Sequence, residues 1–200
     1  MKKKFILAFT MSAAFAIGTL GMTNMPKATA YSYGDMKKVV QYYKKGKMKK
    51  AKKEAKKLPK TVSYGIPIGD DYKELYLEVI EETSDIQEMY LCDYDEDTDS
   101  ELFIKHGTCE ADMVLDCYDI FPEDDEYITH LMWSVNASNS TVHNYYGCSG
   151  IILMSGIQGY EEMHIVDAEG KETTYSRDVG TGSYFNPRCK MKTVKKSYFK

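Results

Sequence analysis

The feature that most constrains this chain is a change in the spacing of its apolar residues near residue 85. Before that point apolar side chains recur every three or four residues, which predicts helices; after it they alternate with polar ones, which predicts strands. Helices followed by hairpin-sized strands predict an α+β fold with a mainly antiparallel sheet. The predicted strands lie near residues 86–92, 101–106, 112–121, 126–135, 150–155, 160–167 and 171–176.

Three helices are expected in the first part of the chain. Two short ones, separated by Gly46 and ended by Pro59, form a Lys-rich helical hairpin, and a third begins at Asp70 with acids in its first turn. Residues 35–60 carry a balance of +10, whereas residues 61–200 carry −18. This asymmetry predicts either that the hairpin docks on its own acidic domain or that it contacts an external polyanion; it does not predict a specific nucleic acid.

The N-terminal residues resemble a Sec signal peptide. Three lysines precede an uncharged apolar run, and the run is followed by Ala28-Thr29-Ala30, which is typical of a cleavage site. We therefore expect residues 1–30 to be removed, which lowers the net charge from −4 to −8, and we expect a secreted protein of a Gram-positive bacterium. No transmembrane segment is expected. The predicted domains are the hairpin (31–60), an α+β domain (61–183) and a basic tail of low order (184–200).

The stretch "LCDYDEDTDSELF" places an acidic loop, residues 93–101, between two predicted strands. Its carboxylates alternate along the chain, and Ca²⁺ takes six to eight oxygen ligands, which alternating side chains of a tight loop can supply. The other interpretation is a solvated loop, but carboxylates this dense repel one another, and a cation would offset that repulsion. The predicted ligands of a structural Ca²⁺ are Asp93, Asp95, Asp97, Asp99 and Glu101.

The loop is not that of an EF-hand, because Thr98 and Ile104 stand where an EF-hand has Gly and a bidentate Glu. It resembles the shorter D-x-D-x-D-G-x-x-E-L loop of FG-GAP/VCBS-type and dockerin-like calcium sites, with Thr98 in place of the Gly. With the segment "GTCEAD" and the later "GIILMSGIQGYE", the chain also resembles a secreted domain found in gut clostridia. That resemblance implies a fold and a habitat, not an activity.

A second candidate site is "HGTCEAD", residues 106–112, which offers an imidazole, a thiol and two carboxylates. One interpretation is the active site of a hydrolase acting on cell-wall or host polymers. The other is a tight turn in which Cys109 is a small buried hydrophobe and Glu110 or Asp112 accepts backbone hydrogen bonds. The five cysteines (Cys92, Cys109, Cys117, Cys148 and Cys189) allow at most two disulfides, and their pairing stays open, as does the oligomeric state.

The sequence thus favours a secreted, non-enzymatic binding or adhesion module. Calcium would stabilise its acidic loop, and the basic hairpin would contact polyanions at the cell surface or in the gut lumen. The hydrolase is the alternative.

Overall fold

The protein is described by a computed structural model of residues 35–59, 61–62, 68–95, 97, 99–123, 126–145, 150–157, 159–185 and 187–200. The expected signal peptide, residues 1–30, lies outside these ranges. All described residues belong to one unit of the chain. Its elements are α1 (Asp35–Lys44), α2 (Met48–Ala55), β1 (Thr61–Val62), α3 (Asp70–Glu82), β2 (Ile86–Cys92), β3 (Glu101–His106), β4 (Val114–Glu123), β5 (Glu126–Asn136), β6 (Ser140–Asn144), β7 (Gly150–Ile157), β8 (Tyr160–Asp167), β9 (Glu172–Asp178), β10 (Lys190–Met191) and the 3₁₀ turn η1 (Lys196–Tyr198).

The strands form two sheets, which confirms the α+β class. Sheet A has the order β1-β10-β6-β7-β8-β9, and sheet B has the order β2-β3-β4-β5. The paired neighbours are antiparallel except β1 and β10, which are parallel. The sequence predicted antiparallel strands but not their division into two sheets, because alternation shows which residues share a face and not which strands share a sheet.

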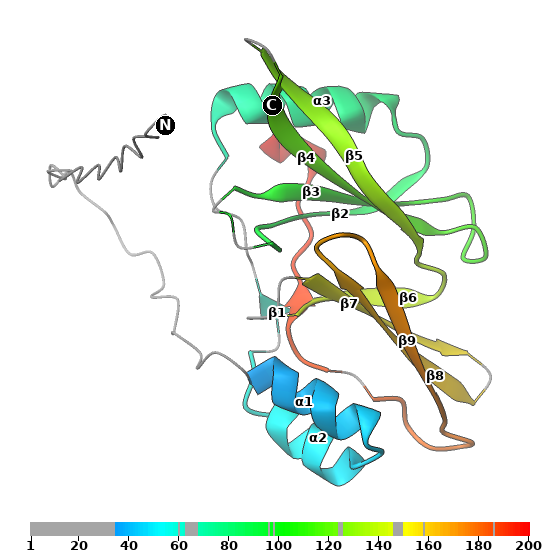
Figure 1. Cartoon of the computed structure of the whole chain (residues 1–200). Helices are drawn as coiled ribbons and strands as arrows, with labels where there is room; N and C mark the ends of the chain where they lie inside the picture. The colour runs from blue at the N-terminus through cyan, green and yellow to red at the C-terminus, as the bar shows by residue number, and fades with distance from the viewer. Residues whose placement is uncertain are drawn as a thin grey trace, which may run out of the picture. The chain divides into compact units, whose positions relative to one another are not determined.

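Three apolar clusters divide the molecule into four layers. The central cluster lies between the sheets and includes Phe103 and Trp133 of sheet B with Ile151 and Val166 of sheet A. The outer face of sheet B packs against α3, and the outer face of sheet A packs against the α1–α2 hairpin. Figure 1 shows the resulting order, with α3 over sheet B and the hairpin below sheet A.

The hairpin docks through its apolar positions. One side of α1 and α2 is buried against Ile152, Met154, Met163 and Ile165 of sheet A. The buried hairpin residues are Met36, Val39, Val40, Tyr43, Ala51, Ala55 and Leu58. Helices of ten and eight residues are marginal alone in water, so this apolar contact is what keeps them folded.

The C-terminal segment was predicted to have low order, but in the structure it is packed against the rest of the domain. Phe185 and Cys189 are buried in the hairpin layer, Met191 between the sheets, and Phe199 beside α3. Backbone hydrogen bonds tie it to both sheets, from Asn144 N to Cys189 O (3.0 Å) and from Val194 N to Met89 O (2.9 Å). The described residues of 184–200 therefore contact all three apolar clusters, and we call this segment the C-terminal strap. In the sequence its apolar residues are separated by lysines and show no regular spacing, so their burial was not predicted.

Two further differences concern strand positions. No strand was predicted between residues 135 and 150, yet Ser140–Asn144 forms β6, a five-residue strand that pairs with β7. The strand predicted near 112–121 begins at Val114, because residues 107–112 are held in a turn. Within the described residues, no helix is both long and apolar enough to cross a membrane.

The turn between β8 and β9 gives a direct test of the central core. Gly170 has φ +76°, and a Cβ there would lie 2.7 Å from Trp133 Cβ. Gly46 has a similar φ of +64°, with open space around its Cα. Gly46→Ala should therefore cost about 1–2 kcal/mol of unfolding free energy for the left-handed backbone alone. We expect Gly170→Ala to cost about 1–3 kcal/mol more, because it adds overpacking.

Urea unfolding of both variants and the parent measures the difference. Equal losses in the two variants would contradict the close packing of the β8–β9 turn on Trp133.

Candidate metal centre

The acidic loop is closed at its base by the pairing of β2 with β3. Cys92 and Glu101 are partners in the antiparallel register, so Asp93 leaves sheet B beside the strand that Glu101 enters. The loop residues Glu96 and Thr98 lie outside the described part of the chain. The strands on either side, predicted at 86–92 and 101–106, are found at those positions.

The structure brings three of the five predicted ligands together. Carboxylate oxygens of Asp93, Asp95 and Glu101 all lie within 4.8 Å of one another, and this group could hold a metal ion. Asp97 and Asp99 are exposed and are not part of it. Asp97 instead shapes the loop, because its Oδ1 accepts a hydrogen bond from Asp99 N at 2.9 Å, which is the turn-forming contact that Asp side chains favour.

Glu101 is the most unusual member of the group. The residue is 0% exposed, and its Oε2 accepts a hydrogen bond from Tyr94 N at 2.8 Å. Its Oε1 and Asp93 Oδ1 are buried and accept no hydrogen bond from any described residue. A buried carboxylate oxygen without a donor is costly, so it requires either a proton or a cation. Burial, with smaller contributions from Asp95 and Asp119, raises the pKa of Glu101 to about 9.

Sequence reasoning missed Asp119, a fourth acid beside this group. The β3–β4 register pairs Leu102 with Tyr118, so the next step places Asp119 opposite Glu101. Asp119 is buried, and its Oδ1 accepts a hydrogen bond from Ile120 N at 2.7 Å. Burial, together with the charges of Asp97, Asp95 and Asp99, raises its pKa. Only the strand register could have revealed it, since Asp119 lies eighteen positions beyond Glu101.

Tyr94 connects the acidic loop to both sheets. Its ring is buried against Phe103 and Trp133, with centroids 5.4 and 6.0 Å away. Its hydroxyl donates to Ala168 O of the β8–β9 turn at 2.6 Å and accepts from Trp133 Nε1 at 3.1 Å. Any ion that fixes the loop therefore also fixes a side chain that holds the two sheets together.

The segment 106–112 forms a turn. Asp112 accepts hydrogen bonds from Thr108 Oγ1 (2.5 Å), Thr108 N (3.2 Å) and Cys109 N (2.7 Å). These bonds, led by the Thr108 hydroxyl, lower the pKa of Asp112 to about 2. Glu110 Oε2 accepts from Asn139 N at 3.1 Å, which ties this turn to the one before β6. The prediction that these acids accept backbone hydrogen bonds is confirmed.

Among the described cysteines, one free thiol is exposed and three are buried. Cys109 is exposed, so its predicted burial is wrong; the turn carries its side chain outward. His106 pairs with Asp116, Nε2 to Oδ2 at 2.8 Å, so its ring is held by a carboxylate of β4. Cys92, Cys117 and Cys189 are buried free thiols, and burial raises the pKa of Cys92 to about 12 and that of Cys189 to about 11. Such thiols remain protonated and unreactive at neutral pH.

Comparisons with family models, curated proteins and solved structures give no match for this chain. The resemblance to FG-GAP/VCBS-type loops and to the gut-clostridial domain therefore stays a prediction. What the geometry shows is an all-oxygen group of carboxylates around a buried, unpaired oxygen, and hard cations bind such groups.

The burial of Glu101 predicts the pH dependence of stability in a chelator. In the folded chain Glu101 keeps its proton up to a pH of about 9, but in the unfolded chain it ionises near 4.5. Between these values the folded state binds more protons, so unfolding free energy should fall as pH rises, by up to about 1.4 kcal/mol per pH unit. Urea unfolding in EDTA from pH 5 to 9 should show this fall.

Glu101→Gln is the matched control, because its amide oxygen can still accept from Tyr94 N while its side chain cannot ionise. The variant should lack this part of the fall. Superimposable pH profiles for the two proteins would contradict the buried state of the Glu101 carboxyl.

Proposed function

We propose that this chain is a secreted, non-enzymatic binding module in which Ca²⁺ stabilises the acidic loop and the lysines of the α1–α2 hairpin contact polyanions. One observation carries the binding role: the hairpin docks by its apolar side and leaves its lysines outward. The N-terminal leader expected from the sequence supports secretion.

Calcium is the cation that best fits the acidic group. All its ligand atoms are carboxylate oxygens, which disfavours soft transition metals. A loop contributes two of the three side chains, and the irregular, adaptable coordination of Ca²⁺ suits a loop better than the strict octahedron of Mg²⁺. Extracellular modules bind Ca²⁺ with Kd values of about 10⁻⁴–10⁻³ M, which suits a medium rich in calcium.

The bound ion would have a structural role. It would neutralise Asp93, Asp95 and Glu101 and supply the partner that Glu101 Oε1 lacks among the described residues. Through Tyr94 it would also strengthen the contact between sheet B and the β8–β9 turn. At about 100 times Kd, such an ion adds about 2.7 kcal/mol to the free energy of unfolding.

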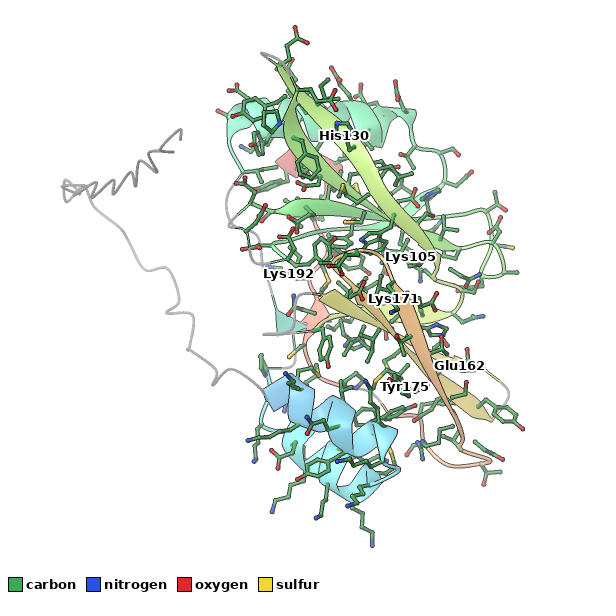
Figure 2. All side chains as sticks on the ribbon, viewed as in Figure 1. Lys105, His130, Glu162, Lys171, Tyr175 and Lys192 are labelled. Atoms are coloured by element: carbon green, nitrogen blue, oxygen red, sulfur yellow. The ribbon has the colours of Figure 1, made fainter. Side chains whose placement is uncertain are left out.

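The hairpin is suited to a polyanionic partner. Residues 35–60 contain twelve lysines and two acids. Lys57, just after α2, lies with its Nζ 2.6 Å from Glu54 Oε2, and no lysine within α1 or α2 forms an ion pair with a described carboxylate. The described lysines of the hairpin are exposed, and Figure 2 shows its many side chains ending in nitrogen; Lys44 Nζ lies 4.4 Å from the centre of the Tyr175 ring of β9. A field of one sign attracts extended polymers of the other sign, and the attraction weakens as salt rises.

Thermal melting of residues 31–200 tests the calcium site. We expect about 10 mM Ca²⁺, which is about 100 times a Kd of about 10⁻⁴ M, to raise Tm over the EDTA value by about 5–10 °C, because the ion then adds about 2.7 kcal/mol to a domain of this size. Mg²⁺ should raise it much less. Glu101→Gln and Asp95→Asn should lose the calcium response.

The double variant Asp97→Asn/Asp99→Asn is the control, since it removes two charges from the same loop but none from the three-carboxylate group. It should keep most of the response. A shift that disappears in this variant and persists in Glu101→Gln would show that general loop charge, and not the group at Glu101, binds the ion.

Retention on an anionic polymer such as heparin tests the hairpin. The parent chain should elute only at raised salt, and Lys45→Gln/Lys49→Gln/Lys53→Gln should elute earlier, because these exposed side chains contribute charge and no packing. Neutralisation is preferable to deletion of the hairpin, which would expose the outer face of sheet A. Flow-through of the folded parent chain at low salt would refute the binding role.

A further inference from the structure

A cavity of about 250 Å³ lies where the hairpin meets the C-terminal strap. The end of α2 and the residue after it contribute Lys52, Ala55 and Lys56, and the strap contributes Tyr184, Phe185 and Arg188. Its lining therefore combines three cations with two aromatic rings and contains no carboxylate.

The aromatic wall is held in place by packing. A Cβ at position 156 would lie 2.9 Å from Tyr184 Cδ1, so the Tyr184 ring lies directly on the backbone of Gly156. The Tyr184 hydroxyl accepts from Gly159 N at 3.4 Å, yet the residue remains 46% exposed. Phe185 is buried, and its ring packs on Tyr43 at a centroid distance of 5.4 Å.

The carboxylate of Glu161, which accepts a hydrogen bond from the cavity residue Phe185, is already paired with a cation. Glu161 is 0% exposed; its Oε1 accepts from Arg177 Nε at 2.8 Å and lies 2.7 Å from Arg177 Nη2, and its Oε2 accepts from Phe185 N. The carboxylate that fixes the Phe185 backbone thus has its own cation. It does not offset the positive charge of Lys52, Lys56 and Arg188.

The Arg188 guanidinium is held in place by one hydrogen bond, but not all of its donors have acceptors among the described residues. Its Nη1 donates to Lys56 O at 3.0 Å, which fixes the guanidinium at the end of α2. Its Nε is buried and donates to no acceptor among the described residues. A guanidinium offers five donors in a rigid fork that matches carboxylate, sulfate and phosphate oxygens. The cavity therefore favours a ligand group that carries an anion.

The aromatic lining narrows the ligand class. A bare inorganic ion would make no use of Tyr184, whereas the C–H face of a sugar ring packs on an exposed aromatic face. Proteins that bind single-stranded nucleic acid present successive aromatic platforms along a groove, and this cavity has one exposed ring. We propose that the cavity binds one acidic sugar residue of an anionic polysaccharide, with its anionic group against Arg188 and the lysines and its ring on Tyr184. This rests on the proposed polyanion-binding role of the hairpin.

The test is titration of residues 31–200 with short oligosaccharides, by calorimetry or by NMR. The probes are an oligogalacturonate (carboxylate only), a heparin-derived tetrasaccharide (sulfate and carboxylate) and a neutral oligosaccharide of equal length. At least one acidic probe should bind and the neutral one should not, and the two acidic probes distinguish the anion. Tyr184→Ala and Lys52→Ala/Lys56→Ala should each weaken binding about tenfold, a loss of about 1.4 kcal/mol.

Lys45→Ala/Lys53→Ala removes the same charge from the hairpin outside the cavity and should weaken binding less than about threefold, as expected for a screened surface charge. Arg188→Lys keeps the charge and removes the fork, so it should bind weakly while its Tm stays near that of the parent. Full affinity in Tyr184→Ala, or equal losses in the two lysine pairs, would overturn the cavity assignment.

Three further outcomes separate the cavity from the wider proposal. Retention on heparin without binding of either short acidic probe would refute the cavity and leave the binding role of the hairpin intact. Tighter binding of a single-stranded oligonucleotide than of either acidic probe would refute the sugar ligand. Absence of both retention and probe binding would refute the cavity and the hairpin role together.

Discussion

The packing of sheet B on sheet A around Trp133 is the interaction on which the other layers depend. The outer face of each sheet is also apolar where helices cover it, with α3 on sheet B and the hairpin on sheet A. The aromatic rings of Tyr94, Phe103 and Trp133 fill the space between the sheets, with T-shaped or tilted contacts at 5.4–6.0 Å. Because Tyr94 belongs to the acidic loop, the charged group at the edge of sheet B and the apolar core share one residue. A change that stabilises the acidic loop should therefore also stabilise the apolar core between the sheets.

Much of the fold could be predicted from the sequence wherever a local signal decides the structure. The strands at 86–92 and 101–106 have clear alternation, and Gly46 and Pro59 punctuate the helices. β6 was missed because it has five residues and follows directly on turn-forming ones, although its Val142 is fully buried. The strap was missed because single apolar residues among lysines show no period. Their burial is decided by elements more than a hundred residues away in the sequence.

The residues of the candidate site also fall into those that the sequence predicted and those that only the structure reveals. Alternating carboxylates predicted the loop, and three of the five expected ligands come together. The other two point outward, and alternation along a chain could not show this, since the direction of each side chain in a loop depends on its turns. Asp119 became visible only through the register of β3 with β4. For residues 106–112 the structure contains the predicted turn, which Asp112 closes by accepting hydrogen bonds from the backbone of Thr108 and Cys109.

The strap has a consequence for the order in which the molecule can assemble. β1 pairs with β10, and Cys189 N donates to Pro59 O at 2.9 Å, so the first described elements are completed by residues more than a hundred positions later in the chain. Contacts this distant along the chain close slowly and late. A growing polypeptide would therefore lack these contacts beside α1 and α2 until residues 187–191 have been synthesised. Cleavage that separates residues 187–200 from the rest of the domain would then first weaken the packing of α1, α2 and β1, the part of the chain that carries the lysines.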